Sequence, residues 1–359
     1  MSETIYSVIT GTGNYIPSRR IRNEDFLTNE FYDIDGKKFE KTNQEIIDKF
    51  QEITTIKERR YVTDDLETSD IAYYAAMDAI RSANIDKEEL DYIIVAHNFG
   101  DASKNNKRLD IVPSIAARVK HKLKIKNPYT IAYDLPFGCP GWLQGIIQAD
   151  YFIKSGDVTK VLVIGADILS RVSDPHDRDS MLYADGAGAT VLEAKKSDNP
   201  IGILAHKTRS DTFSYSKMLY MGKSYKTDNE NKDDIFLKMN GRKLYQYAIE
   251  RVPQAIKDCL EKINTHLSEI KKVLIHQANG KMDDVIFKKL YGLYDIVVPK
   301  NIMPMTIDWL GNSSVATLPT LLDLILKDKL KTHKINKGDT IVFASVGAGM
   351  NINTLIYKM

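Results

Sequence analysis

Cysteine is scarce in this chain, which has 359 residues and only two cysteines, Cys139 and Cys259. Two cysteines are too few for the disulfide framework of a small secreted protein, and their scarcity is typical of a reducing compartment. We therefore expect a cytoplasmic protein. Neither cysteine is expected in a structural cross-link, so each is either a packing residue or a reactive thiol.

An excess of charge of one sign is also lacking. The 50 lysines and arginines nearly balance the 48 acidic residues, which gives a net charge of +2 at pH 7. Proteins that bind nucleic acids or anionic membrane surfaces concentrate positive charge on one face. The sequence therefore indicates neither of these partners.

Long apolar runs are missing as well. No segment reaches the roughly 18 consecutive apolar residues that span a bilayer, and the N-terminus lacks a basic stretch followed by an apolar core. We expect neither membrane insertion nor secretion. The length exceeds that of a usual single core, which favours two packed halves.

The pattern that is present alternates short β-branched runs with longer helical periodicities, as in layered α/β proteins. We expect strands at residues 91–98, 160–167, 189–194, 271–278 and 339–346. We expect helices at residues 69–84, 113–123, 240–263, 280–294 and 317–329, and directly after Cys139.

This alternation also predicts the domain organisation. Each half of the chain ends in a β-rich strand after several helices, so a duplicated fold is expected, with an N-terminal half at residues 1–197 and a C-terminal half at residues 198–359. Three polar stretches are expected to be surface loops or lids. They are residues 28–45, 100–110 and 222–234.

Cys139 lies in the segment DLPFGCPGWLQGIIQADYFIKSG, residues 134–156. Gly138 permits a sharp turn and Pro140 suits the first position of a helix, so the cysteine is predicted at a helix N-terminus. The helix dipole there favours the thiolate by lowering the thiol pKa. Free cysteines are also commonly buried and inert, so the segment alone leaves both interpretations open. Cys259, in AIKDCLEKI, is expected to be a packing residue.

Three further motifs could carry chemistry. His276 in VLIHQANGKM lies where a strand gives way to a helix, and Asn312 lies in the Gly-Asn-Ser-Ser turn of DWLGNSSVATLP. Each also has a purely structural interpretation, as a packed histidine and as a turn or N-cap residue. The glycine loop SVGAGMNIN, residues 345–353, can bring backbone N–H groups close to a ligand.

In this order the four motifs resemble those of the thiolase-fold condensing enzymes, most closely β-ketoacyl-acyl-carrier-protein synthase III. The resemblance extends over GTGNYIP, IKERRYV, residues 153–194, MNGRKLYQYA, HQAN and GNSSVAT. It implies two duplicated halves in a five-layer α-β-α-β-α arrangement. The first half would carry the nucleophilic cysteine, and the second the histidine and asparagine.

The resemblance also implies a mechanism. Cys139 matches the nucleophile that accepts the acyl group, and His276 and Asn312 match the pair that assists decarboxylation of a malonyl thioester. The backbone N–H groups of Cys139 and Ala348 would form the oxyanion hole. The substrates would be thioesters of coenzyme A or acyl carrier protein, and neither a metal nor another cofactor is implied. A homodimer is expected from the family.

Departures from the family pattern bear on the substrate. Two expected coenzyme A contacts fall at Lys49 and Ile53, which favours a carrier-bound donor, and a small residue at the pocket of the neighbouring subunit favours an acyl chain larger than acetyl. The substrate-binding positions implied by the resemblance are Val112, Trp142, Arg178, Asn279 and Lys281.

Alternative functions remain open at this stage. The Cys-Pro-Gly-Trp variant also resembles ketosynthases that condense an acyl chain with a β-ketoacyl thioester and then cyclise the product to a dialkylresorcinol or cyclohexanedione precursor. A non-catalytic partner subunit would be expected to have lost the cysteine, and a cysteine hydrolase would use Cys139 and His276 alone. A biosynthetic thiolase is disfavoured because Cys259 does not lie in a C-terminal glycine loop.

Overall fold

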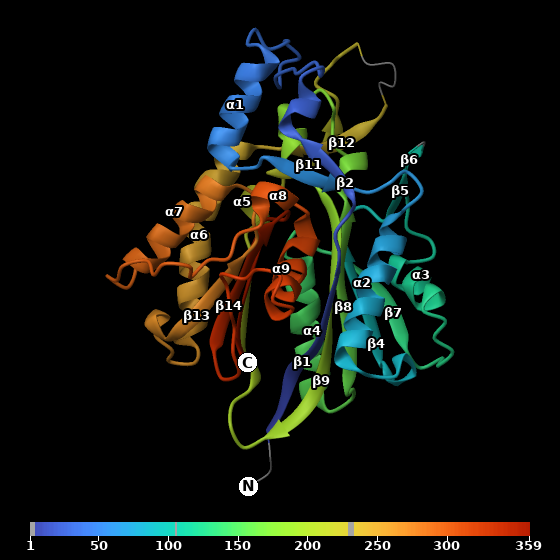
Figure 1. The fold of residues 1–359 in the computed structure, drawn as a ribbon, viewed down its shortest axis with the longest axis vertical. Helices are drawn as coiled ribbons and strands as arrows, with labels where there is room; N and C mark the ends of the chain where they lie inside the picture. The colour runs from blue at the N-terminus through green and yellow to red at the C-terminus, as the bar shows by residue number, and fades with distance from the viewer. Residues whose placement is uncertain (1–3, 105, 229–232) are drawn as a thin grey trace.

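The computed structural model describes residues 4–104, 106–228 and 233–359. Two β-sheets and three groups of helices alternate across the molecule (Figure 1), which confirms the predicted five-layer α-β-α-β-α arrangement. The outer helices on the first sheet are α2 (Thr68–Ala83) and α3 (Ile115–Lys122), the central helices are α4 (Gly141–Ser155) and α9 (Thr317–Leu326), and the outer helices on the second sheet are α6 (Gly241–Glu261) and α7 (Gly280–Gly292).

The first sheet has the strand order β1-β9-β8-β4-β7. β4 pairs in parallel with both β7 and β8, so the carboxyl ends of these three strands meet at one edge of the sheet, where α/β folds place functional groups. The bounds are β1 (Thr4–Tyr15), β4 (Tyr92–His97), β7 (Ile131–Pro136), β8 (Lys160–Ile168) and β9 (Asp185–Ser197).

The second sheet has the strand order β10-β15-β14-β13. Its strands are β10 (Gly202–Ser210), β13 (Ile270–Ile275), β14 (Thr340–Gly347) and β15 (Asn351–Lys358). The connection from β9 to β10 separates the two sheets in the chain, at the predicted seam near residues 197–203. The division into domains at residue 197 itself stays a prediction.

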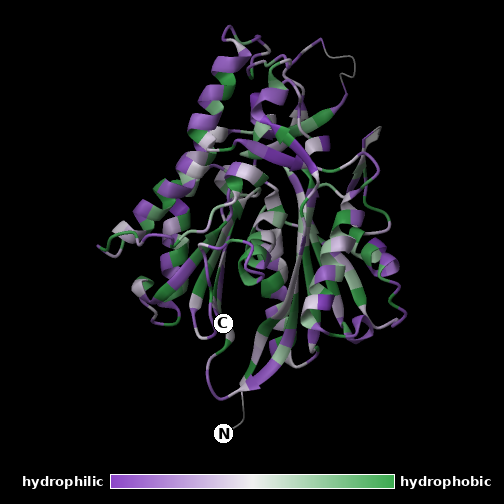
Figure 2. Ribbon diagram, in the orientation of Figure 1, coloured by the Kyte–Doolittle hydropathy of each residue, from purple (hydrophilic) through white to green (hydrophobic). Residues whose placement is uncertain are grey.

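The two central helices join the sheets. α4 contacts β8 and β15, and α9 contacts β9 and β13. Both helices are apolar over most of their surface, as expected for a layer covered on two sides, and α9 is largely green in Figure 2, whereas α1 carries hydrophilic stripes at the periphery. Gly156, in the left-handed region with φ of +87°, ends α4.

Smaller elements cover the carboxyl-end edge of the first sheet, at the top of Figure 1. They are α1 (Asn43–Thr54), the pair β2 (Arg19–Arg22) and β3 (Glu58–Tyr61), the hairpin β11 (Leu219–Lys223) and β12 (Ile235–Met239), and the short helices α5 (Thr212–Tyr215) and α8 (Ile307–Leu310).

Two of the three predicted loops need correction. Residues 100–110 contain a hairpin, β5 (Asp101–Ser103) and β6 (Asn106–Asp110), whose polar strands are too short to show a hydrophobic period. The end of the 28–45 stretch opens α1, because Thr42 and Glu45 form a capping box. In the third stretch, Gly222 and Lys223 end β11, β12 begins at Ile235, and residues 229–232 lie outside the described part of the chain.

Candidate active site

Cys139 lies between the end of β7 and the start of α4. Gly138 has φ of +66°, and the N–H of Gly141 donates to the carbonyl of Gly138 over 2.9 Å, which closes the predicted turn. The helix begins at Gly141 with Pro140 as its N-cap, one position later than predicted. The cysteine thus lies at the N-terminal end of the central helix.

The glycine loop after β14 packs directly against this turn. A Cβ atom on Gly138 would lie 2.8 Å from the backbone nitrogen of Ala348, and one on Gly347 would lie 2.6 Å from the nitrogen of Cys139. Only glycines permit this approach of two backbones. In the described ranges neither the N–H of Cys139 nor that of Ala348 donates to another backbone group, so both can serve an oxyanion.

Burial raises the pKa of the Cys139 thiol to about 11. The hydroxyl of Ser314 and the N–H of Cys139 lower it, and the charge of Asp167 raises it further. The expected lowering of the thiol pKa by the helix end is therefore wrong, because desolvation of the thiolate outweighs the helix dipole. At neutral pH the free enzyme holds a thiol rather than a thiolate.

The Gly-Asn-Ser-Ser turn brings Asn312 and Cys139 together through Ser314. The Ser314 hydroxyl donates to Cys139 Sγ over 3.3 Å, and the Ser314 N–H donates to Asn312 Oδ1 over 2.9 Å. Since the carboxamide oxygen of Asn312 is occupied, its Nδ2 is the group available to donate to a substrate. Sequence reasoning missed Ser314, although it lies in the motif that pointed to Asn312.

His276 is buried directly after β13. The backbone N–H of His276 donates to the carbonyl of Ala344 over 2.8 Å. Ala344 lies on β14, the strand that leads to the glycine loop. Burial lowers the pKa of His276 to about 4, so the imidazole is neutral at pH 7. The next residue, Gln277, accepts a hydrogen bond from the N–H of Ile307 over 3.0 Å and so ties β13 to the segment before Asn312.

Two of the predicted substrate-binding residues have structural partners. Trp142 is buried in the central layer, where its indole N–H donates to Thr190 Oγ1 over 3.2 Å and its ring meets the edge of Phe343. Asn279 caps α7, and its Oδ1 accepts from the N–H of Met282 over 3.1 Å. These contacts account for both side chains without a ligand, and their substrate role stays a prediction.

The other three substrate-binding positions are more accessible. Arg178 lies over the ring of Phe39 at 5.2 Å, and Lys281 forms an ion pair with Glu52 on α1 at 3.3 Å. Val112 is 81% exposed. The role of each in binding substrate also stays a prediction.

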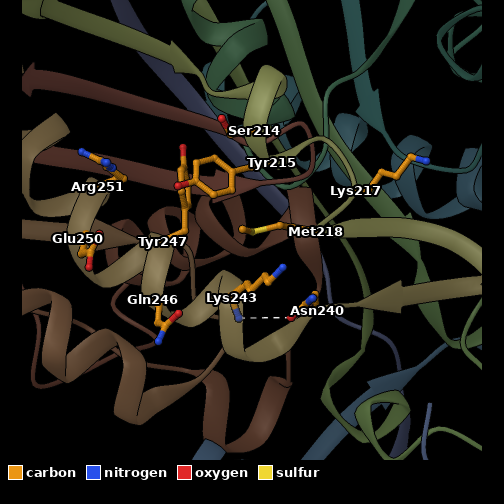
Figure 3. A pocket seen from close by; sticks show the side chains of 10 residues that line it. All are labelled: Ser214, Tyr215, Lys217, Met218, Asn240, Lys243, Gln246, Tyr247, Glu250 and Arg251. Carbon is orange, nitrogen blue, oxygen red and sulfur yellow. Dashed lines mark hydrogen bonds between the residues drawn. The ribbon is translucent and has the colours of Figure 1, made fainter. Parts of the chain in front are cut away.

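A cavity of about 430 Å³ lies between α5 and α6 (Figure 3), away from the contacts of Cys139. Asp211 connects the cavity to the glycine loop, because its N–H donates to the carbonyl of Met350 and its carboxylate accepts from Tyr247. The lining contains three cationic side chains and one acidic one, so it favours an anionic group. It consists of Ser214, Tyr215, Lys217, Met218, Asn240, Lys243, Gln246, Tyr247, Glu250 and Arg251.

Within residues 4–104, 106–228 and 233–359, no three His, Cys, Asp or Glu side chains gather as metal ligands would. No helix in these ranges combines the length and apolarity needed to cross a bilayer. The five-layer arrangement, with the Cys139 thiol at the N-terminal end of the central helix α4, places this chain among the thiolase-fold condensing enzymes.

Comparisons with known proteins narrow this class. Residues 133–212 match the family profile of 3-oxoacyl-[acyl-carrier-protein] synthase III, and residues 260–359 match its C-terminal profile. A β-ketoacyl-[acyl-carrier-protein] synthase III of Vibrio parahaemolyticus is 35% identical over 99% of this chain and 100% of its own length. The synthase III of Ehrlichia canis is 33% identical over 98% of this chain and 99% of its own.

Solved structures agree with the sequence comparison. The 3-oxoacyl-[acyl-carrier-protein] synthase III of Aquifex aeolicus is 29% identical, has a TM-score of 0.80 and covers 98% of this chain and 100% of its own. A priming β-ketosynthase of the R1128 polyketide pathway shares the fold, with a TM-score of 0.81 at 23% identity over 100% of this chain and 98% of its own. The chain belongs to the 3-oxoacyl-[acyl-carrier-protein] synthase III family and is a condensing acyltransferase.

Proposed function

We propose that this protein accepts an acyl group on Cys139 and condenses it with a malonyl-type thioester on acyl carrier protein. The contact between the Cys139 turn and the glycine loop carries this proposal, since it leaves two backbone N–H groups beside the thiol. Such a pair stabilises the oxyanion of a thioester under attack.

The first half-reaction transfers the acyl group. Cys139 Sγ attacks the carbonyl carbon of the donor thioester, and the N–H groups of Cys139 and Ala348 bind the resulting oxyanion. Collapse of this intermediate breaks the bond from carbon to the donor sulfur. The thiol proton of Cys139 ends on the departing donor thiol, so the products are an acyl-enzyme and a free thiol.

The second half-reaction generates the carbon nucleophile. Loss of CO₂ from the malonyl thioester leaves an enolate, whose oxygen is bound by the imidazole N–H of His276 and by Nδ2 of Asn312. The low pKa of His276 supports this role, because a neutral imidazole donates a hydrogen bond without protonating the enolate carbon. The enolate carbon attacks the acyl group, the bond to Sγ breaks, and the Cys139 thiolate takes up a proton.

Acyl carrier protein is the proposed donor partner. Lys281 lies at the exposed N-terminal turn of α7, where it can exchange its ion pair with Glu52 for an acidic carrier. Lys49 is also paired with Glu52, at 2.9 Å, and Phe39 covers the guanidinium of Arg178. Lys49 and Ile53 stand where two coenzyme A contacts are expected, and Phe39 lies against the Arg178 guanidinium, so a carrier-bound substrate is favoured.

A homodimer is the proposed assembly, with Val112 of each copy facing the acyl pocket of the other. The high exposure of Val112 and the unpaired edge of β7 support this arrangement. A valine leaves room for an acyl chain longer than acetyl.

We place the reaction in the cytoplasm, where both cysteines stay reduced. We also propose that residues 1–197 carry the nucleophile and that residues 198–359 carry the decarboxylating pair.

Intact-protein mass spectrometry tests the proposal. Incubation with a panel of acyl thioesters is expected to add one acyl mass to the wild type and to Cys259→Ala, and none to Cys139→Ala. An adduct that survives Cys139→Ala would falsify the proposed nucleophile. Product analysis with malonyl and β-ketoacyl thioesters then identifies the second substrate, and release of free acid at a rate independent of either would indicate a hydrolase instead.

A further inference from the structure

Three neighbouring strands of the first sheet deliver polar groups to the edge where Cys139 lies. Cys139 follows β7, Asn98 directly follows β4, and Asp167 is near the end of β8. Since β4 pairs in parallel with the other two, these residues meet at one end of the sheet. Ser314, from the second half of the chain, completes the group.

The four side chains form a continuous hydrogen-bonded chain. Asn98 Nδ2 donates to Asp167 Oδ2 over 2.6 Å and to Ser314 Oγ over 3.0 Å, and the Asn98 backbone N–H donates to Asp167 Oδ1 over 2.9 Å. Ser314 Oγ lies 3.3 Å from Cys139 Sγ. Asp167 is 1% exposed and Ser314 is 4% exposed, so these two acceptors are shielded from water, whereas Asn98 and Cys139 are partly exposed.

The order of donors and acceptors in this chain favours a hydrogen bond from Ser314 to Cys139. Burial raises the pKa of Asp167 to about 6, so at pH 7 it is a carboxylate that can only accept, and this orients the amide of Asn98 with its nitrogen inward. The second amide hydrogen then goes to Ser314 Oγ. The single proton of the Ser314 hydroxyl is donated to Cys139 Sγ, because the Asp167 carboxylate, which the hydroxyl also reaches, already accepts two hydrogen bonds from Asn98.

We propose that Ser314 is a catalytic residue whose hydroxyl stabilises the Cys139 thiolate by a hydrogen bond, and that Asn98 and Asp167 are positioning residues that aim it. The proposal rests on the proposed function only in taking Cys139 as the nucleophile. The hydrogen bond acts twice in the cycle, when Sγ attacks the donor thioester and when it is expelled as a thiolate after condensation.

The surroundings of Cys139 explain why such a donor is needed. Burial raises the thiol pKa to about 11, which disfavours the thiolate that attacks a thioester. No other side chain among the described residues donates a hydrogen bond to Sγ. A hydrogen bond to a charged group stabilises it by about 1.5–3 kcal/mol, equivalent to about a tenfold to a hundredfold change in the thiolate population.

The hydroxyl can be removed without disturbing Asn312. The Ser314 backbone N–H, not its side chain, holds Asn312 Oδ1, so it persists in Ser314→Ala. Ser314 has φ of +52°, and Ser314→Gly therefore removes the same hydroxyl while relieving the backbone. If the alanine variant is unstable, the glycine variant tests the same group.

The rate of Cys139 alkylation by iodoacetamide against pH tests the proposal, with Cys139→Ala as the blank. Ser314→Ala and Ser314→Gly are expected to raise the apparent pKa of Cys139 by about one unit, which slows alkylation about tenfold at neutral pH, with the same plateau at high pH. Ser313→Ala is the matched control in the same turn, since its hydroxyl contacts Thr317, and its profile is expected to match the wild type. A wild-type profile in folded Ser314→Ala or Ser314→Gly overturns the role of the hydroxyl.

A double-variant cycle tests the positioning residues. Asn98→Ala frees the Ser314 hydroxyl to turn toward Asp167, so it is expected to raise the apparent thiol pKa as Ser314→Ala does. The double variant Asn98→Ala/Ser314→Ala is expected to raise the apparent thiol pKa no further than either single variant. Additive increases in the pKa would show that Asn98 does not act through Ser314. Alkylation requires no thioester, so this outcome is independent of whether acyl adducts and condensation products form.

Discussion

His276 is buried and Cys139 is partly exposed, and desolvation shifts their pKa values in opposite directions because their charged forms have opposite sign. Desolvation lowers the pKa of the imidazole to about 4 and raises that of the thiol to about 11. Both groups are therefore neutral in the resting enzyme. Each of them can donate a hydrogen bond at neutral pH, and neither adds a buried charge that would destabilise the fold.

The neutral state of His276 makes stability depend on pH. The imidazole has a pKa of 6.5 in the unfolded chain and about 4 in the folded one, so its contribution is fully present above pH 6.5 and is lost as the pH falls toward 4. Between pH 7 and pH 5 the wild type is expected to lose about 2 kcal/mol more unfolding free energy than His276→Gln. Urea unfolding at both pH values measures this difference.

The exposed His121 supplies the control for that experiment. His121→Gln is expected to follow the wild type at both pH values. If His276→Gln also follows the wild type, the imidazole is already charged at pH 5 and its proposed role as a neutral donor is wrong.

Lys238 is a second buried titratable residue, on β12. Its ammonium lies 2.5 Å from Asp174 and 3.2 Å from Asp177, with the ring of Tyr225 at 3.4 Å. Lys238→Met would leave two carboxylates without their cation, and it is expected to lower the unfolding free energy by about 3–5 kcal/mol. Urea unfolding measures the loss.

Matched variants separate charge from packing at this position. Adding Asp174→Asn to Lys238→Met is expected to recover part of the loss, since it removes one uncompensated charge. Exposed Lys337→Met is expected to change the unfolding free energy by less than about 0.5 kcal/mol. An equally small effect of Lys238→Met would mean that the buried ion pair contributes nothing.

Residue types could be read from the sequence, but their partners could not. Cys139, His276 and Asn312 were chosen from motif context, and they lie at the ends of a helix, a strand and a turn as that context implied. The raised thiol pKa depends on how deeply the thiol is surrounded, and the Ser314 contact joins residues from the two halves of the chain. Neither property has a local signature.

Secondary structure was predictable from the sequence for the elements that other parts of the protein cover on both faces. All five expected strands and all six expected helices are present, with bounds that differ by a few residues, because a strand covered on both faces is a continuous apolar run. The missed elements mix polar and apolar residues. β7 contains Asp134 and Pro136, and β10 ends in the polar stretch HKTRS, so neither shows a clear period.

The contact between the turn after β14 and the start of α4 depends on Gly347. A Cβ atom there would lie 2.6 Å from the backbone nitrogen of Cys139 and 2.6 Å from Cδ in the ring of Pro140, neither of which can swing aside. Gly347→Ala is therefore expected to separate the two N–H groups of the oxyanion hole and to slow acyl-enzyme formation by about a hundredfold or more. Time-resolved mass spectrometry of the adduct measures the rate.

A glycine in open space serves as the control. Gly292, at the end of α7, has no atom within 4 Å of an added Cβ. Gly292→Ala is expected to acylate at the wild-type rate and to be slightly more stable, by about 0.5–1 kcal/mol. Normal acylation by Gly347→Ala would show that the close approach of the loops is not required.

At the scale of the whole molecule, β7 ends the first sheet with one edge unpaired in the described chain. Exposed Tyr129 and Ile131 lie along it, whereas isolated proteins usually protect such edges with charges or prolines. The Ile131 N–H donates inward to Asp91, so the N–H of Ala132 points outward. This edge suits pairing with a second copy.

Ala132→Pro removes that outward donor. The wild type is expected to be a dimer at micromolar concentration and the variant a monomer, because proline cannot donate across the new edge but is tolerated at an outer strand position. Light scattering after gel filtration measures both masses. A monomeric wild type, or a variant that remains dimeric, would contradict pairing through β7.

The fold as a whole was predictable because its motifs are spread over both halves. GTGNYIP ends strand β1, HQAN follows β13 and GNSS is a turn, so these motifs lie at the ends of buried elements in both halves. The pairing of copies stays a family expectation, since the edge strand β7 carries no distinctive pattern of its own. The cavity between α5 and α6 was not predicted, because its lining comes from two segments that are polar and unremarkable in sequence.

The backbone contact between Gly138 and Ala348 has a consequence for the newborn chain. A ribosome adds about 5–20 residues per second, so Cys139 leaves the exit tunnel about 10–40 s before the residues that complete its oxyanion hole. During that interval the thiol has no site in which to react with the acyl thioesters of the cell. On the proposed mechanism, a chain that ends before Ala348 therefore lacks one of the two N–H groups of the oxyanion hole.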